Sequence, residues 1–298
     1  MIEQRKVALS TGITMNVALA GPDDGPPTLF VHGFPESHRT WRKLVPLIGD
    51  QVRMIMPDLR GFGATDKPQD VADYATDKLV ADLFALADSL GIDEFALVGH
   101  DWGGAVAWAA ALRGNSRITR LAIINSPHPL IFQRSLIDDP AQRAASQYMN
   151  AFRTPTMEQG IARMGLETFF DKSFAPHIDV TRITPEDRSF YLNDWAQPGA
   201  LTAMLNWYRA SQIHVPQPHE DAPMPDWVKR GVAKLRIPLR IIWGLDDKAL
   251  LPLQLEGIGE VGDDVDIFPL PGIGHFAPWE APDQVAGPLK PFLLAQAG

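Results

Sequence analysis

The sequence contains no cysteine, and this absence excludes disulfide frameworks, thiol nucleophiles and thiolate metal sites together. It also has no block of lysines and arginines, and its formal net charge is −9, so neither nucleic acid nor an anionic membrane surface is expected as a partner. No apolar run is long enough to span a bilayer, and the first residues, MIEQRKVALSTG, include no apolar stretch typical of a secretory signal. We therefore expect a soluble, cytoplasmic protein whose ligand is small and not strongly anionic.

The remaining composition is that of an ordinary globular protein. Apolar residues make up 45% of the 298 residues and charged residues 21%, which permits a large buried core without metals or disulfides. Short β-branched or apolar runs alternate with longer helical patterns, as in units of strand and helix around a mostly parallel sheet. The pattern predicts an α/β fold with strands over 13–21, 26–33, 52–58, 94–100, 118–126, 237–244 and 265–272, and helices over 39–49, 76–91, 102–113 and 283–297.

The alternation of strands and helices stops between residues 126 and 231. This region has helical patterns over 139–153, 185–196 and 199–212, proline-rich joints and no convincing strand. An all-helical insertion between two strands is expected to cover the carboxyl ends of the sheet, where open α/β sheets bind ligands. The sequence therefore predicts a core of residues 1–125 and 232–298 and a helical lid of residues 126–231.

The segment GHDWGG connects a predicted buried strand to a predicted helix, and it resembles the turn G-x-S-x-G that presents a catalytic serine. The serine position here holds Asp101. An aspartate that begins a helix is ordinarily an N-cap, but Gly99 and Gly103 permit a cramped turn between strand and helix. We interpret Asp101 as a nucleophile, because a carboxylate is already ionised at neutral pH and can attack carbon directly.

A base and an orienting acid follow Asp101 in the order that such a turn requires. His275 lies in the glycine-rich loop after the last predicted strand, from which a base can reach the turn. The other histidines show no metal-ligand spacing, so no metal site is expected. Asp246 and Asp247 are adjacent after the strand that ends at residue 244, and only one of them can face the imidazole.

The segment HGFPES follows a predicted strand and leads into a predicted helix. Gly33 and Pro35 permit a tight turn, with room for a cis peptide bond, that aims the backbone amide of Phe34 at the turn of Asp101. Together with the backbone amide of Trp102, it would form an oxyanion hole.

Four motifs in a fixed order indicate a family. HGFPES, PDLRGFGATDKP, GHDWGG and GIGH follow the order of the α/β-hydrolase family, and the chain resembles its epoxide hydrolases over essentially its whole length. The resemblance implies an α/β-hydrolase fold with a helical lid, and an orienting acid five residues before a proline. Asp247 stands in that relation to Pro252, and Asp246 does not. Enzymes of this type use two lid tyrosines, which QYMNAFRTP and LNWYRAS match at Tyr148 and Tyr208.

The implied reaction converts a small apolar epoxide and water to a vicinal diol without a cofactor. Asp101 would form an alkyl ester with the substrate, and Tyr148 and Tyr208 would donate a proton to the ring oxygen. His275, oriented by Asp247, would then activate the water that hydrolyses the ester.

Two alternatives remain open from the sequence. A haloalkane or haloacid dehalogenase would use the same triad, and the indole of Trp102 would suit a departing halide. Against it, Phe34 stands where a side-chain donor would be expected, and no arginine follows Asp101 closely enough to hold a haloacid carboxylate. A non-catalytic small-molecule receptor with the same fold is less favoured, because acid, base and nucleophile are all present.

Overall fold

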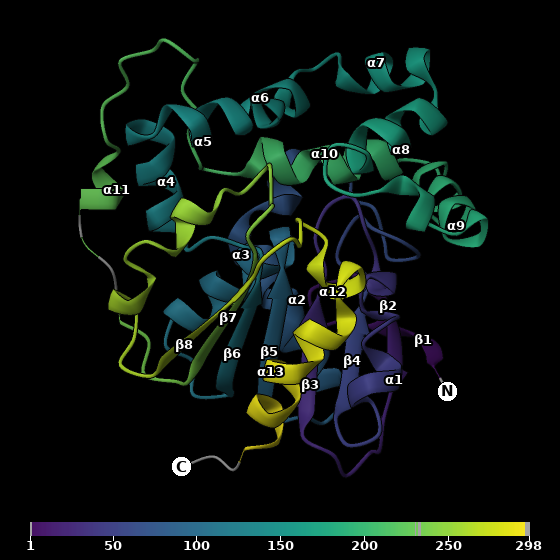
Figure 1. Ribbon diagram of the computed structural model, residues 1–298. Coiled ribbons are helices and arrows are strands. Elements are labelled where there is room, and N and C mark those ends of the chain that lie inside the picture. The colour runs from purple at the N-terminus through teal and green to yellow at the C-terminus, as the bar shows by residue number, and fades with distance from the viewer. Residues whose placement is uncertain (1, 230, 232–233, 296–298) are drawn as a thin grey trace.

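A mostly parallel sheet lies at the centre of the molecule (Figure 1). The computed structural model describes residues 2–229, 231 and 234–295, and within them eight strands form one sheet in the order β1-β2-β4-β3-β5-β6-β7-β8. β2 pairs antiparallel with β1 and β4, and all other pairings are parallel. The strands are β1 (Glu3–Ala8), β2 (Thr14–Ala20), β3 (Pro27–Val31), β4 (Arg53–Pro57), β5 (Phe95–His100), β6 (Ile118–Ile124), β7 (Leu239–Gly244) and β8 (Val265–Leu270).

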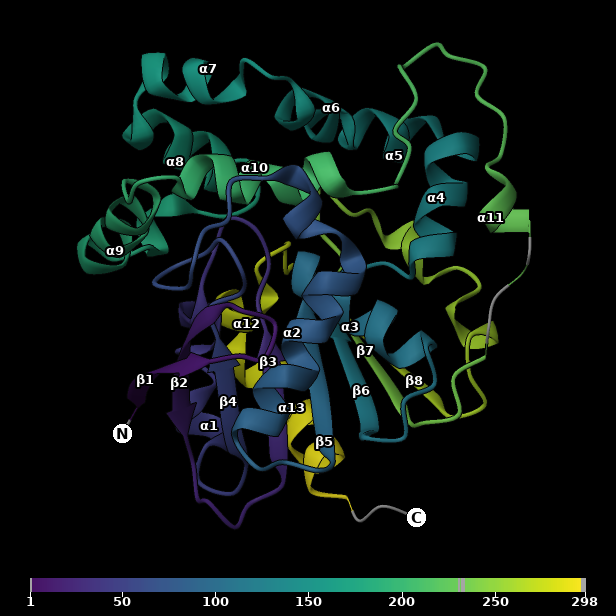
Figure 2. The same ribbon diagram turned by 180° about the vertical axis from the view of Figure 1, so that it is seen from behind.

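The central strand β5 is buried along its whole length, which explains why its sequence, FALVGH, is a nearly continuous apolar run. Its alternate residues face different layers of the protein. Leu97 packs in the core that includes α2 (Thr76–Ser89) and α3 (Asp101–Leu112), whereas Val98 packs in the core that includes α1 (Val45–Ile48) and α13 (Pro282–Leu294). Figures 1 and 2 show these two helical layers from opposite sides, so the fold is the predicted α/β arrangement.

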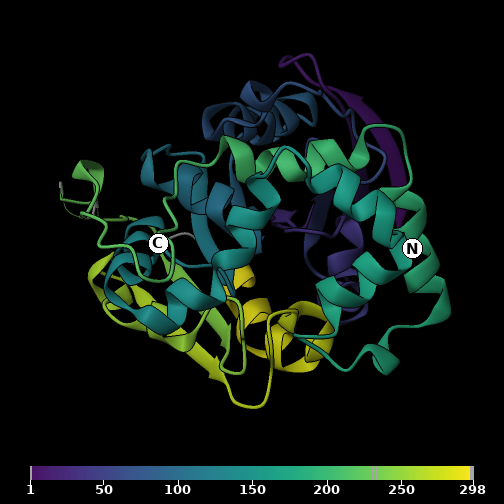
Figure 3. The ribbon, with the colours of Figure 1, turned by 90° about the horizontal axis from the view of Figure 1, so that it is seen from above.

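All the helices between β6 and β7 lie together beyond one edge of the sheet, and the described residues of this stretch contain no strand (Figures 1 and 3). We call them the inserted helices: α4 (Pro129–Asp138), α5 (Pro140–Ala145), α6 (Gln147–Arg153), α7 (Met157–Met164), α8 (Leu166–Phe174), α9 (Pro185–Trp195), α10 (Ala200–Ala210) and α11 (Asp226–Lys229). The other short elements are α12 (Ala277–Glu280) and the 3-10 helices His38–Trp41, Val71–Tyr74, Val180–Arg182, Pro252–Leu255 and Ile258–Glu260. Among the described residues, no helix has both the length and the hydropathy of a membrane-spanning segment.

Several predicted elements differ from the observed ones. The predicted helix over 39–49 is a 3-10 turn followed by the four-residue α1, and the predicted helix over 139–153 divides at Ser146 into α5 and α6. The sequence did not predict β1, α4, α7 or α8. The predicted return to the core at residue 232, and the last residues of the helix predicted over 283–297, lie outside the described residues.

Candidate active site

The turn between β5 and α3 places Asp101 at the first position of the helix, in a left-handed conformation with φ of 50°. A side chain at Gly103 would place its Cβ 2.1 Å from the carbonyl oxygen of Val31. A Cβ on Gly99 would lie 2.6 Å from Cα of Gly104. Glycine is therefore required at both positions, because strand, turn and the neighbouring strand approach each other too closely for any side chain. This packing holds the aspartate at the carboxyl edge of the sheet.

The carboxylate of Asp101 is held by three groups. The backbone amide of Phe34 donates to Oδ1 at 2.7 Å, and the backbone amide of Trp102 also donates to the carboxylate. Nε2 of His275 lies 3.5 Å from Oδ2. The peptide bond between Phe34 and Pro35 is cis. The two backbone amides thus meet at Asp101.

His275 is held on its other side by Asp247. Nδ1 of His275 lies 2.7 Å from Oδ2 of Asp247, which also accepts a hydrogen bond of 2.8 Å from the side-chain amide of Asn125. Oδ1 of Asp247 accepts from the backbone amides of Ala249 and Leu250, both at 2.9 Å. The buried carboxylate is therefore fully hydrogen-bonded, and it fixes Nδ1 as the protonated nitrogen of the imidazole.

The charges of Asp101, Asp247 and His275 shift one another's pKa values, upward for the imidazole and downward for the two carboxyl groups. Burial alone would lower the pKa of His275, but the charge of Asp247 and the hydrogen bonds to Asp101 and Asp247 raise it well above its ordinary value. Burial alone would raise the pKa of Asp101 and of Asp247, but the charge and hydrogen bonds of His275 hold both below their ordinary values. These shifts favour the charged form of each group, an imidazolium between two carboxylates.

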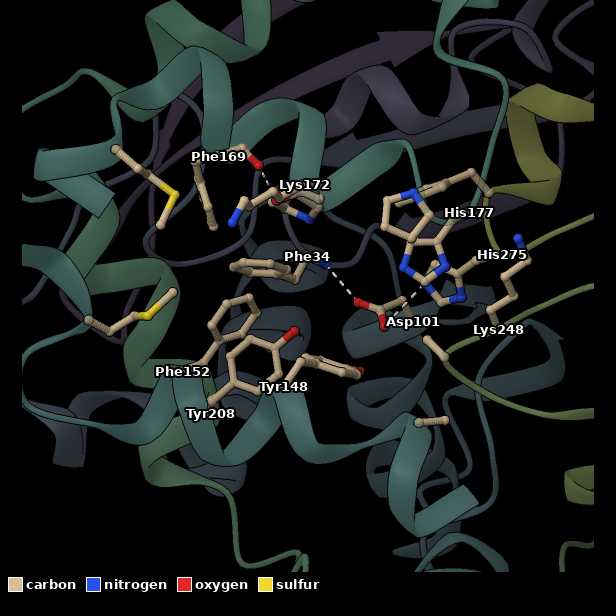
Figure 4. Close-up of a pocket in the computed structure, with 18 residues that line it drawn as sticks. Phe34, Asp101, Tyr148, Phe152, Phe169, Lys172, His177, Tyr208, Lys248 and His275 are labelled. Atoms are coloured by element: carbon tan, nitrogen blue, oxygen red, sulfur yellow. Dashed lines mark hydrogen bonds and ion pairs between the residues drawn. The ribbon is translucent and has the colours of Figure 1, made fainter. Parts of the chain in front are cut away.

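Tyr148 and Tyr208 lie on the opposite side of the same cavity, on α6 and α10 (Figure 4). Their ring centroids are 6.1 Å apart. Burial and the negative charge of Asp101 raise the pKa of both phenols above the ordinary value, so both are neutral at neutral pH. The indole of Trp102 donates to the Tyr208 hydroxyl. Neutral phenols beside a carboxylate can donate a proton but cannot act as bases.

The cavity itself has a volume of about 480 Å³, and a smaller cavity of about 70 Å³ shares Asp101, Tyr148 and Tyr208 with it. Apolar and aromatic side chains form most of the wall of the larger cavity, which suits a ligand with an apolar body and few polar groups. Among the lining residues that Figure 4 labels around Asp101 are Phe34, Phe152, Phe169 and His275.

Comparison with known proteins identifies the family. The family model described as alpha/beta hydrolase fold matches residues 26–282. AB hydrolase superfamily protein YfhM of Bacillus subtilis (strain 168) is 36% identical, with 81% of this chain and 80% of the relative covered. The chain belongs to the α/β-hydrolase fold family.

Within this α/β-hydrolase fold family, the relatives include proteins named epoxide hydrolases. Epoxide hydrolase 4 of Homo sapiens is 30% identical, with 84% of this chain and 67% of the relative covered. A solved structure from work on novel epoxide hydrolases in metagenomes from hot environments has a TM-score of 0.89 and 45% identity, over 99% of this chain and 100% of that one. The structure of a mutant of an epoxide hydrolase from Bacillus megaterium, with its diol product bound, has a TM-score of 0.85 and 28% identity, over 97% of this chain and 99% of that one. The predicted resemblance to epoxide hydrolases is thereby confirmed.

The structure brings together the seven residues selected from the sequence: Phe34, Asp101, Trp102, Tyr148, Tyr208, Asp247 and His275. Asp246, the other candidate for the orienting acid, is exposed and lies outside this group. The structure also adds residues that the sequence did not indicate. Asn125 was not among the residues selected from the sequence, yet its side-chain amide donates a hydrogen bond to Asp247. Lys172, His177 and Lys248 line the cavity as well, and no motif marked them. A polar residue directly after a buried strand, as Asn125 is after β6, is the one signal that could have been used.

Proposed function

We propose that this chain is an epoxide hydrolase that forms a covalent ester on Asp101. The observation that carries the proposal is the pairing of a carboxylate at the nucleophile turn with two neutral phenols across the same cavity. A serine at this turn would need a base before it could attack, whereas the carboxylate does not. The names of the relatives support the same reaction.

In the first step, a carboxylate oxygen of Asp101 attacks a ring carbon of the epoxide. The C–O bond of the ring breaks, and the electron pair moves to the ring oxygen, which takes a proton from Tyr148 or Tyr208. The phenols suit this role because their raised pKa keeps them protonated until the oxygen develops charge. The product of the step is an alkyl ester of Asp101 with a neighbouring hydroxyl.

In the second step, His275 acts as the base. Esterification removes the negative charge of Asp101 and its hydrogen bond, two of the interactions that raise the pKa of His275. The pKa of His275 therefore falls in the intermediate, and the imidazolium passes its proton to the phenolate, directly or through water. The neutral imidazole can then take a proton from the hydrolytic water. Hydroxide adds to the ester carbonyl, and the backbone amides of Phe34 and Trp102 receive the oxyanion.

Collapse of the tetrahedral intermediate completes the cycle. The bond between the carbonyl carbon and the alkyl oxygen breaks, so the original carboxylate oxygen leaves with the diol and the oxygen of water stays on Asp101. The proton of the added hydroxyl passes to the departing alkyl oxygen, so the cycle ends with an ionised Asp101, a protonated His275 and neutral phenols. Epoxide and water are thus converted to a vicinal diol with no cofactor, and we propose that residues 126–231 form the lid that covers this reaction.

The dehalogenase alternative loses its main support in this geometry. A halide leaving group would require the indole of Trp102, and that indole donates to the hydroxyl of Tyr208 instead. A diol assay on a terminal epoxide, run beside a halide assay on a chloroalkane, distinguishes the two reactions. Halide release without diol formation would refute the epoxide hydrolase proposal.

The decisive experiment is a single turnover of an aryl epoxide in heavy-oxygen water, followed by mass analysis of the peptide that contains Asp101. We expect the heavy oxygen on the Asp101 carboxylate and ordinary oxygen in the first diol released. Heavy oxygen only in the diol would mean direct attack by water and would refute the ester mechanism.

A further inference from the structure

The two helices that carry the phenols end beside each other, and each end is capped by an arginine of the other helix. α6 ends at Arg153 and α10 ends at Ala210. Nε of Arg153 donates to the carbonyl oxygen of Tyr208, in the last turn of α10, at 3.0 Å. Nη2 of Arg209 donates to the carbonyl oxygen of Thr154, directly after α6, also at 3.0 Å. The carboxyl ends of the two helices are therefore joined by a reciprocal pair of hydrogen bonds.

A guanidinium is well suited to such a position. The last carbonyl groups of a helix have no partner within the helix, and the helix dipole places negative charge there. Arg209 also forms an ion pair of 2.6 Å with Glu158 of α7. Within the described part of the chain Arg153 has no carboxylate partner, and its Nη2 donates to the carbonyl oxygen of Ile213 at 2.7 Å. Both hydrogen bonds of Arg153 thus go to the backbone at and after the end of α10.

Two more side chains of α6 bind the segment that follows α10. Nδ2 of Asn150 donates to the carbonyl oxygen of Val215 at 3.0 Å, and Nε2 of Gln147 donates to that of Pro216 at 2.9 Å. Gln147, Asn150 and Arg153 are spaced three residues apart, so they lie along one side of the helix. This side of α6 is therefore attached to the end of α10 and to the segment beyond it.

The other side of α6 faces the cavity. Tyr148 and Phe152 are one turn apart, and both line the cavity together with Tyr208 (Figure 4). The ring centroid of Phe152 lies 5.7 Å from that of Tyr148 and 5.0 Å from that of Tyr208. Two phenols can serve one ring oxygen only if both hydroxyls come within hydrogen-bond reach of it. Their separation depends on how α6 and α10 are joined.

The charge of Arg153 acts on Tyr208 as well. Burial is the largest influence on the pKa of Tyr208 and raises it, and the positive charge of Arg153 opposes this rise. The guanidinium therefore favours the phenolate that forms when Tyr208 gives up its proton.

We propose that Arg153 is a positioning residue for ring opening, which joins α6 to α10 so that the hydroxyls of Tyr148 and Tyr208 reach the same epoxide oxygen. The inference rests on the proposed function. Arg209 completes the link, but its loss would also break the ion pair with Glu158 of α7. Arg153 is therefore the residue to test.

The test measures ester formation and ester hydrolysis separately in Arg153→Met, by stopped-flow fluorescence and intact mass during a single turnover of an aryl epoxide. We expect ester formation to slow by about 10-fold, because the phenols lose their alignment, and ester hydrolysis to be unchanged. Arg153→Lys keeps the charge and a donor, so it should recover part of the lost rate. In a Tyr208→Phe background, Arg153→Met should slow ester formation by less than about 2-fold, since the hydroxyl that it positions is already absent.

Arg143→Met is the matched control. Arg143 of α5 also donates to backbone carbonyl groups at the end of an inserted helix, to Leu136 of α4 at 2.9 Å and to Ile137. Its loss should lower the thermal unfolding midpoint about as much as the loss of Arg153, yet leave ester formation unchanged.

Three results would overturn the role of Arg153. They are unchanged ester formation in Arg153→Met, equal slowing in Arg143→Met, and a loss in the Tyr208→Phe background as large as in the wild type. Equal slowing of ester formation and ester hydrolysis would also overturn it, because a general loosening of the inserted helices would affect both steps. A wild-type protein that formed neither ester nor diol would instead refute the proposed function.

Discussion

The carboxyl edge of the sheet and the inserted helices meet at the cavity, and they contribute different kinds of group to it. The sheet edge supplies ionised side chains, Asp101, Asp247 and His275, whose atoms are fixed by backbone amides and by each other. The inserted helices supply aromatic rings and the neutral phenols of Tyr148 and Tyr208. The difference corresponds to two roles in the proposed reaction: charged groups on the sheet side form and hydrolyse the ester, and neutral donors on the helical side protonate the ring oxygen.

The largest expected effect is the loss of the nucleophile. Asp101→Asn keeps the shape of the side chain and tolerates the left-handed backbone at φ of 50°. We expect diol formation to fall by about 10⁴-fold or more, because no ester can form, while the thermal unfolding midpoint stays close to that of the wild type. Diol formation and unfolding are measured on the same preparation. Retention of full activity would refute the mechanism at its first step.

A change at Asp247 should affect the second step alone. In Asp247→Asn, attack by Asp101 proceeds but the base is misoriented, so ester hydrolysis should slow by about 10³- to 10⁴-fold and the alkylated enzyme should accumulate. The negative charge of Asp247 raises the pKa of His275. Its removal lowers that pKa, so the neutral base persists to lower pH and the acid limb of the remaining hydrolysis rate should move downward.

Intact-mass measurement during turnover, with a pH series, checks this prediction. Asp246→Asn is the matched control, because it makes the same change at the exposed neighbour and should leave hydrolysis unchanged. If Asp246→Asn accumulated the ester instead, the assignment of the orienting acid would be reversed.

Loss of the phenols should have a smaller effect, and on the first step. Tyr148→Phe with Tyr208→Phe should slow ester formation by about 10²- to 10³-fold, since the ring oxygen would leave without a proton donor, and no ester should accumulate. Stopped-flow loss of protein fluorescence and intact mass measure ester formation. Tyr74→Phe is the control, because the hydroxyl of Tyr74 donates to the carbonyl of Pro68 and lies outside the cavity lining. Accumulated ester in the double variant would place the phenols in the second step.

The sequence predicted the sheet-side residues and their spatial grouping more fully than the helical side of the cavity. Glycines and buried strands mark the turn of Asp101, because local packing alone demands them. The strand β1 was missed because it is an exposed edge strand with no apolar alternation. Lys172 and Lys248, which line the cavity, were missed because the sequence does not reveal which lysines form ion pairs. Ion pairing depends on tertiary neighbours: Asp171, for example, pairs with Arg188.

The smallest expected effect concerns Trp102, whose indole donates to the hydroxyl of Tyr208. Trp102→Phe keeps the backbone amide that faces Asp101 and removes one neutral hydrogen bond to a phenol, so diol formation should fall by roughly 2- to 10-fold. Halide release from a matched chloroalkane should be absent in wild type and variant alike. If wild-type protein released halide and Trp102→Phe did not, the indole would be serving a leaving group directly. Asp101 would then displace halide without the phenols, and the proposed separation of roles between the sheet side and the helical side of the cavity would be wrong.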